Sequence, residues 1–590
     1  MAQSGKTAEE REEARIGLLT IIAGIIGFAA GIVAFVLYHL IGFLTNLFFY
    51  QKLDFSFGSP QYNHLGPMVI LIPALGGFIA GLMIKYGSTR IIGHGIPEAI
   101  ESVLLGKSKI EPKVGVLKAV SAAFTIGSGQ PFGAEGPIIQ TGGSIGSLIG
   151  QAISVTGSER RILLSCGAAA GMAATFGTPI SAVFLVIELL LFEFRVKSLV
   201  PVAIASAIGA WMHIYLISPK PLFSTPVYSF GGFNALPFYV ALGLLSGVLG
   251  TALSRGLYKS EDLFRKLPLG QPWLPTLGGI AVGVIGFLVP QILGVGYDVI
   301  TSLIDSKVTL ELAFLILVAK AIAWVLAMGS QTSGGTLAPL FMIGSALGLI
   351  FGTAVVAAFP SLGVLPGVFA IAAMAAVFGT ASRAPFASIV FALEVTQAYQ
   401  GVLPVIVTVV IAELVGEYLM TDSIMTEKLA RRGLRVRHIY EFNPLRQIRV
   451  SSIMSPLDAV DSDKPVMEIF RLINLPDHSF TRRKRLVVLK NGSAVGIVDR
   501  AQLYRGASNA DPEMTVGEVA SKDFLTINED EFGFEALRLM SLNDLAFLIV
   551  VDRNNKAVGY ISRGDLIRAQ KDKIADDTIV EKGIWARLFE

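Results

Sequence analysis

The sequence predicts an α-helical polytopic membrane domain with broken helices, followed by a soluble α+β module. The chain is 53% hydrophobic and 16% charged, and its mean hydropathy is +0.63. A soluble globular protein cannot keep that much apolar surface away from water. Apolar runs fill roughly the first 425 residues, whereas charged residues gather in the remainder. Membrane lipid is therefore the expected surrounding of the first part only.

Glycine or proline interrupts several of the apolar segments. A helix that stops inside a bilayer leaves unpaired N–H groups, which are tolerated only when they are buried in protein or face a polar cavity. Broken segments therefore indicate a transport site. The apolar segments lie at residues 16–49, 67–85, 117–155, 160–217, 236–257, 274–296, 312–328, 336–378 and 384–421.

Two pairs of segments repeat within this region. FGTPISAVFLVIEL (176–189) resembles VFGTASRAPFASIVFALEV (377–395), and EGPIIQTGGSIG (135–146) matches LAPLFMIGSALG (337–348). Small residues that allow close helix packing are one explanation, but the shared order and spacing favour two repeated halves, about 16–217 and 236–425. In transporters built from repeats, the site lies where the repeats meet.

The two ends of the membrane domain, residues 16–425, indicate its orientation. Residues 1–15 are polar and lack the pattern of a cleaved signal, so they predict a cytoplasmic N-terminal segment. A basic cluster lies in the predicted linker 426–448, and the positive-inside rule places it in the cytoplasm. We therefore expect a multi-pass protein of the cell membrane with both termini cytoplasmic. The cluster comprises Lys428, Arg431, Arg432, Arg435 and Arg437.

The soluble module consists of two tandem copies, 449–508 and 513–575, before a tail at 576–590. RLVVLKNGSAVGIVDRAQLYR (485–505) and AFLIVVDRNNKAVGYISRGDLIR (546–568) each predict a strand, an Asn-containing turn, a strand and a helix. Two such copies predict one compact α+β unit.

Glycine-rich loops precede apolar helices in GHGIPEAIE (93–101), GSGQPFGAEGP (127–137) and GGTLAPLF (334–341). Glycine lets the backbone approach a ligand, and helix N-termini that converge on one point bind an anion. A nucleotide loop is disfavoured because neither G-x-G-x-x-G nor Gly-Lys-Ser/Thr occurs in them. Acidic residues are few in the apolar part, which disfavours cation selectivity. The loops therefore favour anion transport.

Glu135 is the one carboxylate in the glycine-rich stretch GSGQPFGAEGPIIQTGG (127–143). When ionised it can occupy an anion site, and when protonated it can leave, so it is a candidate gate. A solvated glutamate at a loop end is the alternative.

Other classes of function have little support in the sequence. Cys166 is the only cysteine, which excludes a disulfide and a cysteine-based metal site. No catalytic or metal-binding constellation occurs, so we expect no enzyme, no metal and no required cofactor. The net charge of +3 gives no reason to expect nucleic-acid binding.

The motifs GHGIPE, GAEGP and GGTLAP, in this order and followed by a tandem soluble pair, resemble GSGIP, GKEGP and GxFxP of the CLC chloride channels and H⁺/Cl⁻ exchangers. The resemblance covers nearly the whole chain. It implies inverted repeats, a homodimer with one anion pathway per subunit, and cytoplasmic CBS domains. Chloride and other small anions are the implied ligands.

The resemblance assigns roles to individual residues. Glu135 falls on the external gating glutamate, which competes with the anion and relays a proton. The backbone N–H groups of Thr336 and Leu337 fall on the donors to the central anion. The other loop residues that the resemblance places around the anion are Gly95, Gly133, Ala134 and Gly136.

Two anion ligands of the family are replaced. His94 stands in place of the central serine, and an imidazole donates an N–H when neutral or carries charge at acidic pH. It is therefore a candidate anion ligand and proton carrier, and the alternative is a ring that only donates a hydrogen bond or points away. Thr421 aligns with the central tyrosine, and Tyr418, one helical turn earlier, is the alternative.

The internal proton glutamate of the exchangers is replaced by Leu189. Leucine cannot pass a proton inward, so the sequence favours gated chloride conduction. The alternative is an H⁺/Cl⁻ antiporter in which His94 or a water chain replaces that glutamate. Glu188, the preceding residue, is expected to cap a helix, as is its repeat mate Glu394. A membrane-anchored nucleotide sensor is the alternative of another class, although an anchor needs no repeated broken segments.

The soluble copies resemble CBS repeats, whose paired cleft often holds adenine nucleotides such as ATP, ADP or AMP. Ser562 and Asp565 fall on the family's phosphate-binding hydroxyl and ribose-binding carboxylate. The first copy has Asp499 and Gln502 at these places, where a carboxylate would repel phosphate. One nucleotide site is therefore expected, and a dimerising module without ligand is the alternative.

Overall fold

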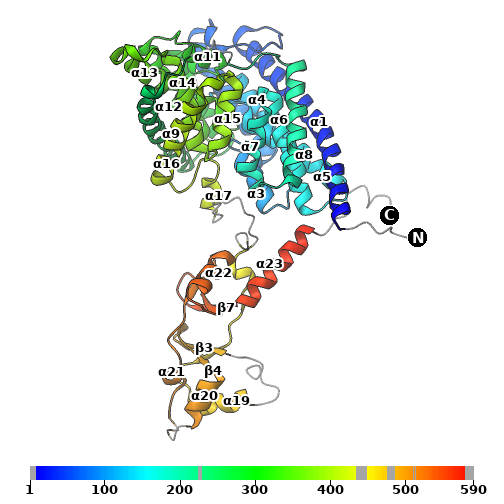
Figure 1. Cartoon of the computed structure of the whole chain (residues 1–590), viewed down its shortest axis with the longest axis vertical. Coiled ribbons are helices and arrows are strands. Elements are labelled where there is room, and N and C mark those ends of the chain that lie inside the picture. The colour runs from blue at the N-terminus through cyan, green and yellow to red at the C-terminus, as the bar shows by residue number, and fades with distance from the viewer. Residues whose placement is uncertain are drawn as a thin grey trace, which may run out of the picture. The chain divides into compact units, whose positions relative to one another are not determined.

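Two compact units make up the described part of the chain, residues 8–432 and residues 445–578, as drawn in Figure 1. The computed structural model describes residues 8–223, 229–432, 445, 448–474, 485–508, 511 and 513–578. Arg435 and Arg437 of the predicted basic cluster lie outside the described residues, as does most of the tail 576–590.

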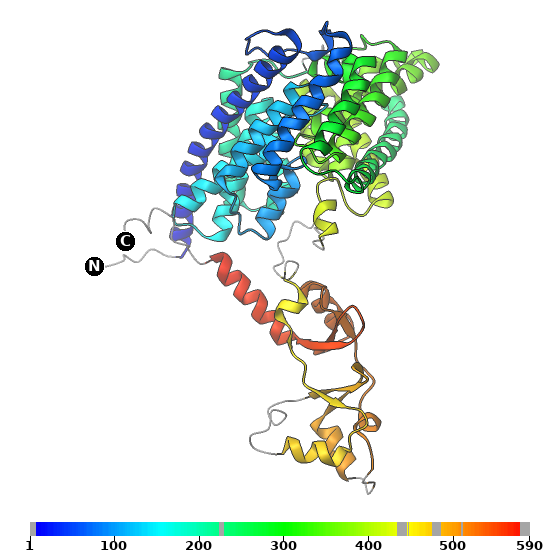
Figure 2. The ribbon, with the colours of Figure 1, turned by 180° about the vertical axis from the view of Figure 1, so that it is seen from behind.

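The first unit is α-helical. Within the described residues, seven helices are long and apolar enough to cross a membrane, and shorter apolar helices lie among them. Figure 2 shows the long first helix, in dark blue, along one edge of this unit. The helices are α1 (Ala8–Tyr50), α2 (Leu71–Tyr86), α3 (Ile96–Leu104), α4 (Pro112–Gly127), α5 (Glu135–Ala152), α6 (Gly157–Phe176), α7 (Pro179–Val186), α8 (Val196–Leu216), α9 (Leu236–Arg265), α10 (Trp273–Leu288), α11 (Tyr297–Ile304), α12 (Leu310–Gly329), α13 (Leu337–Ala358), α14 (Pro366–Ser382), α15 (Pro385–Thr396), α16 (Val402–Leu419) and α17 (Glu427–Arg431).

The predicted repeats begin equivalent helices in the two halves. Helices α5 and α13 start at Glu135 and Leu337, with a proline in the first turn of each. Helices α7 and α15 start at Pro179 and Pro385. Proline suits these positions because its missing N–H would have no partner at a helix start.

Each half caps a helix of the other half. The Glu188 carboxylate lies in the π-helical turn that follows α7, Ile187–Leu191, and accepts the N–H groups of Phe386 (3.1 Å) and Ala387 (2.9 Å) at the start of α15. The capping role expected for Glu188 is therefore confirmed.

Glu394 of α15 makes the reciprocal interaction. Its carboxylate accepts the N–H groups of Ile180 (3.0 Å) and Ser181 (2.8 Å) at the start of α7. These N–H groups would otherwise be orphans inside an apolar domain, where an unpaired polar group is costly.

The second unit contains two small sheets, with strand orders β1-β7-β6-β5 and β2-β3-β4. In each copy a parallel pair, β2 with β3 or β5 with β6, adjoins an antiparallel hairpin, β3 with β4 or β6 with β7. The elements are α18 (Val450–Ile453), β1 (Ser455–Pro456), β2 (Ala459–Asp461), α19 (Val466–Ile473), β3 (Arg485–Lys490), β4 (Ser493–Asp499), α20 (Arg500–Ser508), α21 (Val516–Val519), β5 (Thr526–Asn528), α22 (Gly533–Leu542), β6 (Phe547–Val551), β7 (Ala557–Ser562) and α23 (Arg563–Thr578).

The predicted strand–turn–strand–helix pattern is present in both copies. Asn491 and Gly492 form the first turn with φ of 54° and 82°, the left-handed values that such a two-residue hairpin turn requires. Helices α20 and α23 follow the two hairpins directly.

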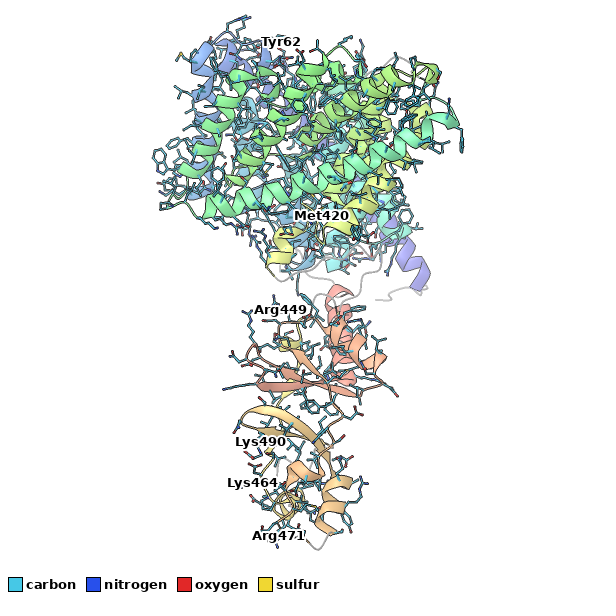
Figure 3. All side chains as sticks on the ribbon, turned by 90° about the vertical axis from the view of Figure 1, so that its left-hand side faces the viewer. Tyr62, Met420, Arg449, Lys464, Arg471 and Lys490 are labelled. Carbon is cyan, nitrogen blue, oxygen red and sulfur yellow. The ribbon has the colours of Figure 1, made fainter. Side chains whose placement is uncertain are left out.

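Each copy of the soluble unit contributes a segment that packs with the other copy. Strand β1 belongs to the sheet of the second copy, because it pairs with β7. Val450, which precedes it, packs in the core of the second copy and donates its N–H to the Glu531 carbonyl. In return, Val516 packs in the core of the first copy. Figure 3 shows this division, with Arg449 at one end of the unit and Lys464 and Lys490 toward the other.

Candidate functional site

The three glycine-rich loops meet inside the first unit. The Gly93 N–H donates to the Thr332 carbonyl (2.7 Å), and the Gly334 N–H donates to the Gly93 carbonyl (3.2 Å). Gly133 and Gly335 exchange two backbone hydrogen bonds of 3.3 and 2.9 Å. The loop residues proposed to surround the anion are all buried here, namely Gly95, Gly133, Ala134, Gly136, Thr336 and Leu337.

Glu135 places its carboxylate at the start of helix α13. Oε1 accepts the backbone N–H of Ala338 (3.1 Å), one residue past the predicted donor Leu337, whose N–H also stabilises the carboxylate. The residue is 1% exposed. The first turn of a 22-residue helix combines free N–H groups with the positive end of the helix dipole, so it is an anion-binding position that Glu135 now fills.

Two glycines make room for this carboxylate. A Cβ at Gly133 would overlap both carboxylate oxygens, and a Cβ at Gly335 would overlap Oε2. Oε2 has no hydrogen-bond partner in the part of the chain that the structure describes. The glycines therefore leave a space at the helix start that an anion or the carboxylate can fill, but not both.

A buried ammonium group supports the loop that carries His94. Lys118 of α4 is fully buried and donates to the carbonyls of Ile91 (2.9 Å) and Gly93 (2.6 Å). Gly93 and Gly95, on either side of His94, have φ of 85° and 90°, which only glycine adopts without strain. The backbone on both sides of His94 is therefore not covered by a side chain of its own.

The other half repeats this arrangement at Lys320 of α12, which donates to the carbonyls of Ile292 (2.9 Å) and Gly294 (2.8 Å). Lys320 is also the cation that interacts electrostatically with Glu135. Sequence analysis missed both lysines, although each interrupts an apolar stretch and their positions, 118 and 320, differ by the same 202 residues as Pro137 and Pro339.

The His94 ring contacts the segment that follows α16. Nε2 lies 3.1 Å from the carbonyl oxygen of Ile424, which also accepts the Tyr258 hydroxyl of α9 at 2.8 Å. His94 is 2% exposed, and Nδ1 has no partner among the described residues. Tyr258 is thus the tyrosine that shares an acceptor with His94, and sequence analysis did not find it.

The structure corrects the assignment of Thr421. This residue is exposed, and its hydroxyl donates to Asp422 (3.1 Å) rather than contacting His94. Tyr418 is 90% exposed and does not replace it. The chain leaves α16 in an extended conformation at Met420, so the next buried side chains are those of Ser423 and Ile424.

Three cavities are lined by residues of the loops or of neighbouring segments. One of about 710 Å³ is lined by Ile92 and Gln140 beside the His94 loop and by six basic and three acidic side chains. Another of about 400 Å³ is lined by Tyr258 and Met420. A smaller one of about 90 Å³ is lined by Pro60 and Gly294. Figure 3 shows Tyr62, two residues after Pro60, near one end of the unit and Met420 toward the other.

Leu189 is buried at 1% exposure within the π-helical turn. It places an apolar side chain directly after the capping Glu188. The described part of the chain contains no group of three or more His, Cys, Asp or Glu residues that could hold a metal ion.

Comparison with known proteins identifies the family. The family described as "Voltage gated chloride channel" matches residues 76–417, more than half of the chain, and the CBS domain matches residues 516–572. The chain belongs to the CLC family. This CLC protein is membrane-embedded, and its helical unit followed by a CBS-containing unit is the predicted fold class.

Relatives of this CLC protein include both named subtypes. The chain is 28% identical to a putative chloride channel protein ClcB-like of Ralstonia nicotianae, over 61% of this chain and 85% of that protein. It is 27% identical to the H(+)/Cl(-) exchange transporter ClcA of Citrobacter koseri, over 72% of this chain and 90% of that protein.

Solved structures show the same fold. A slow cyanobacterial Cl⁻/H⁺ antiporter superposes with a TM-score of 0.64 at 26% identity, covering 70% of this chain and 97% of that chain. A eukaryotic CLC transporter gives a TM-score of 0.62 at 19% identity, covering 93% and 97%.

In the soluble unit, the two nucleotide-binding candidates bond to each other. The Asp565 carboxylate accepts the Ser562 hydroxyl (2.6 Å) and N–H (2.9 Å) and so caps α23. Asp499 and Gln502 form the equivalent pair at α20, with two hydrogen bonds of 2.8 Å. Both pairs hold a hairpin against its helix.

Proposed function

We propose that this CLC protein transports chloride through a gated pathway in which Glu135 is the gate. The observation that carries the proposal is the position of the Glu135 carboxylate, which accepts the Ala338 N–H at the start of α13 in a space bounded by Gly133 and Gly335. A chloride ion and this carboxylate compete for the same donors. The pathway is closed while the carboxylate is bound.

Protonation opens this gate. A neutral carboxyl loses the charge that strengthens its bonds to backbone N–H groups, since a charge-assisted hydrogen bond is about twice as strong as a neutral one. Chloride then competes more strongly than the neutral carboxyl for the N–H groups at the start of α13. The cavity beside the His94 loop, with its excess of basic side chains, provides a favourable approach for an anion.

Leu189 favours passive conduction, because a buried leucine passes no proton toward Glu135. Proton-coupled exchange is the second candidate, and the names of the relatives favour it, since several are exchangers or antiporters. In that case His94 or water takes the place of the internal glutamate.

Chloride and proton fluxes, measured together in liposomes, test the proposal. At saturating chloride, wild-type efflux is expected to fall as pH rises, and Glu135→Gln is expected to remove this dependence. Glu417→Gln, an exposed carboxylate on α16, serves as the matched control and should behave as wild type. No chloride flux, or a pH dependence unchanged by Glu135→Gln, would overturn the proposal, and uphill proton movement driven by chloride would exclude passive conduction.

The remaining features complete the proposal. Both termini lie in the cytoplasm, the chain forms a homodimer with one pathway per subunit, and an adenine nucleotide at Ser562 and Asp565 regulates transport. The protein is a transporter rather than an enzyme. Intact nucleotide binding without any anion flux would instead favour a membrane-anchored nucleotide sensor.

A further inference from the structure

The hydrogen bond from His94 fixes which ring nitrogen carries the hydrogen. Nε2 lies 3.1 Å from the Ile424 carbonyl oxygen, and a carbonyl only accepts. Nε2 is therefore protonated. The Tyr258 hydroxyl donates to the second lone pair of the same oxygen, which holds that oxygen in place. A neutral His94 consequently has a bare lone pair on Nδ1.

That lone pair is buried and unused. Nδ1 has no hydrogen-bond partner among the described residues, and the side chain is 2% exposed. A neutral Nδ1 accepts hydrogen bonds, so it repels an anion rather than binding one. Serine at this position would donate its hydroxyl, and His94 can donate from Nδ1 only after it takes a second proton.

The surroundings of His94 determine whether its ring can take this second proton. Burial of the ring opposes a positive charge on it most strongly, and Lys428 of α17 and Lys118 of α4 oppose it electrostatically as well. Glu98 of α3 pairs with Lys428 at 3.7 Å and offsets part of this repulsion, while Tyr258 of α9 contributes a neutral hydroxyl. A chloride ion beside the ring supplies the missing negative charge.

We propose that His94 Nδ1 binds one proton together with each anion that occupies the inner end of the site and releases it when that anion leaves. The proposal rests on chloride transport through this site and specifies its coupling. The proton comes from the aqueous solution and forms one N–H bond, with no other covalent change. His94 thereby supplies a proton-carrying group near the pathway in a chain that has Leu189 in place of the internal glutamate.

Chloride binding to the purified full-length protein tests this inference. The Glu135→Gln variant removes the proton that the gate itself would exchange. Calorimetric titration of this variant with chloride, in two buffers of different ionisation enthalpy, gives the number of protons taken up. We expect an uptake approaching one proton per chloride and an affinity that falls up to roughly tenfold per pH unit.

Two further variants separate His94 from its surroundings. Glu135→Gln with His94→Ser should still bind chloride but take up no proton, since a serine hydroxyl donates without titrating. Glu135→Gln with Tyr258→Phe should retain the uptake, because Nε2 keeps its bond to Ile424. If the serine variant fails to fold, His94→Asn replaces it.

The inference is overturned if Glu135→Gln binds chloride without proton uptake, or if the uptake persists after His94 is replaced. Failure of the proposed function looks different, because then Glu135→Gln neither binds nor conducts chloride.

Discussion

Gly133→Ala is expected to expel the Glu135 carboxylate from its site. The three atoms nearest to the new methyl group would be the two carboxylate oxygens and the Cδ of Glu135, so the clash falls on the end of a flexible side chain. The φ of Gly133 lies outside the left-handed region, and alanine can adopt it. The substitution therefore acts on the gate and leaves the loop backbone in place.

The expected magnitude follows from the bond that is lost. A displaced carboxylate gives up the Ala338 N–H at 3.1 Å, and a hydrogen bond to a charged group contributes about 1.5–3 kcal/mol. At about 1.4 kcal/mol per factor of ten, the closed state becomes roughly 10- to 150-fold less populated relative to the open state.

Chloride efflux from liposomes between about pH 5 and about pH 8 measures this shift. Wild-type efflux is expected to be high at low pH, where Glu135 is protonated, and to fall as the carboxylate ionises and re-enters the site. Gly133→Ala should keep efflux high at the upper end of this range, close to the rate of Glu135→Ala.

A comparison in the Glu135→Ala background controls for the methyl group itself. If Gly133→Ala slows efflux there, the methyl group obstructs the anion. If it has no effect there and the single variant still closes with rising pH as wild type does, the carboxylate does not occupy the space beside Gly133, and the reasoning is refuted.

Two further predictions concern the structural carboxylates and the soluble unit. Glu188→Gln and Glu394→Gln should each lower the midpoint of thermal unfolding in detergent by a similar amount, because each weakens two charge-assisted bonds of about 1.5–3 kcal/mol, whereas the exposed Glu417→Gln should not. Loss of stability in only one of the pair would contradict the reciprocal role. Asp565→Ala should weaken AMP binding to the full chain roughly tenfold or more, as measured by calorimetry, because a hydrogen bond to a charged group is lost. Asp499→Ala is the control and should not weaken AMP binding. Equal losses of affinity in the two variants would argue against a single site at Ser562 and Asp565.

The sequence predicted the glycine-rich loops and drew attention to Glu135 because their signals are local. Glycine and proline before apolar helices specify a backbone geometry, and Glu135 is conspicuous among them. The repeat likewise predicted that Glu188 and Glu394 are equivalent. Those inferences needed no knowledge of how distant segments pack.

The partners of His94 were not predictable in this way. Its acceptor is the main-chain carbonyl of Ile424, which any residue would provide, and Tyr258 reaches that carbonyl from a helix 166 positions earlier in the chain. Thr421 was misplaced because it lies on an irregular segment after α16, where the path of the loop decides which side chain faces inward. Helical or strand periodicity does not extend to such a segment.

The packing of Val450 and Val516 was not predictable for a related reason. Sequence similarity delimits each copy as a continuous stretch, but Val450 packs with the second copy and Val516 with the first. Pairing between lobes depends on tertiary contacts that neither stretch contains alone.

The reciprocal bonds of Glu188 and Glu394 have a consequence for the independence of the two halves. Each half holds the acceptor that the other half needs at the start of α7 or α15, so neither can satisfy its own backbone in an apolar medium. A protein with only one copy would need a second molecule to supply the missing carboxylate. The two halves therefore depend on each other, and a chain severed between them should recover its structure only when both pieces are present.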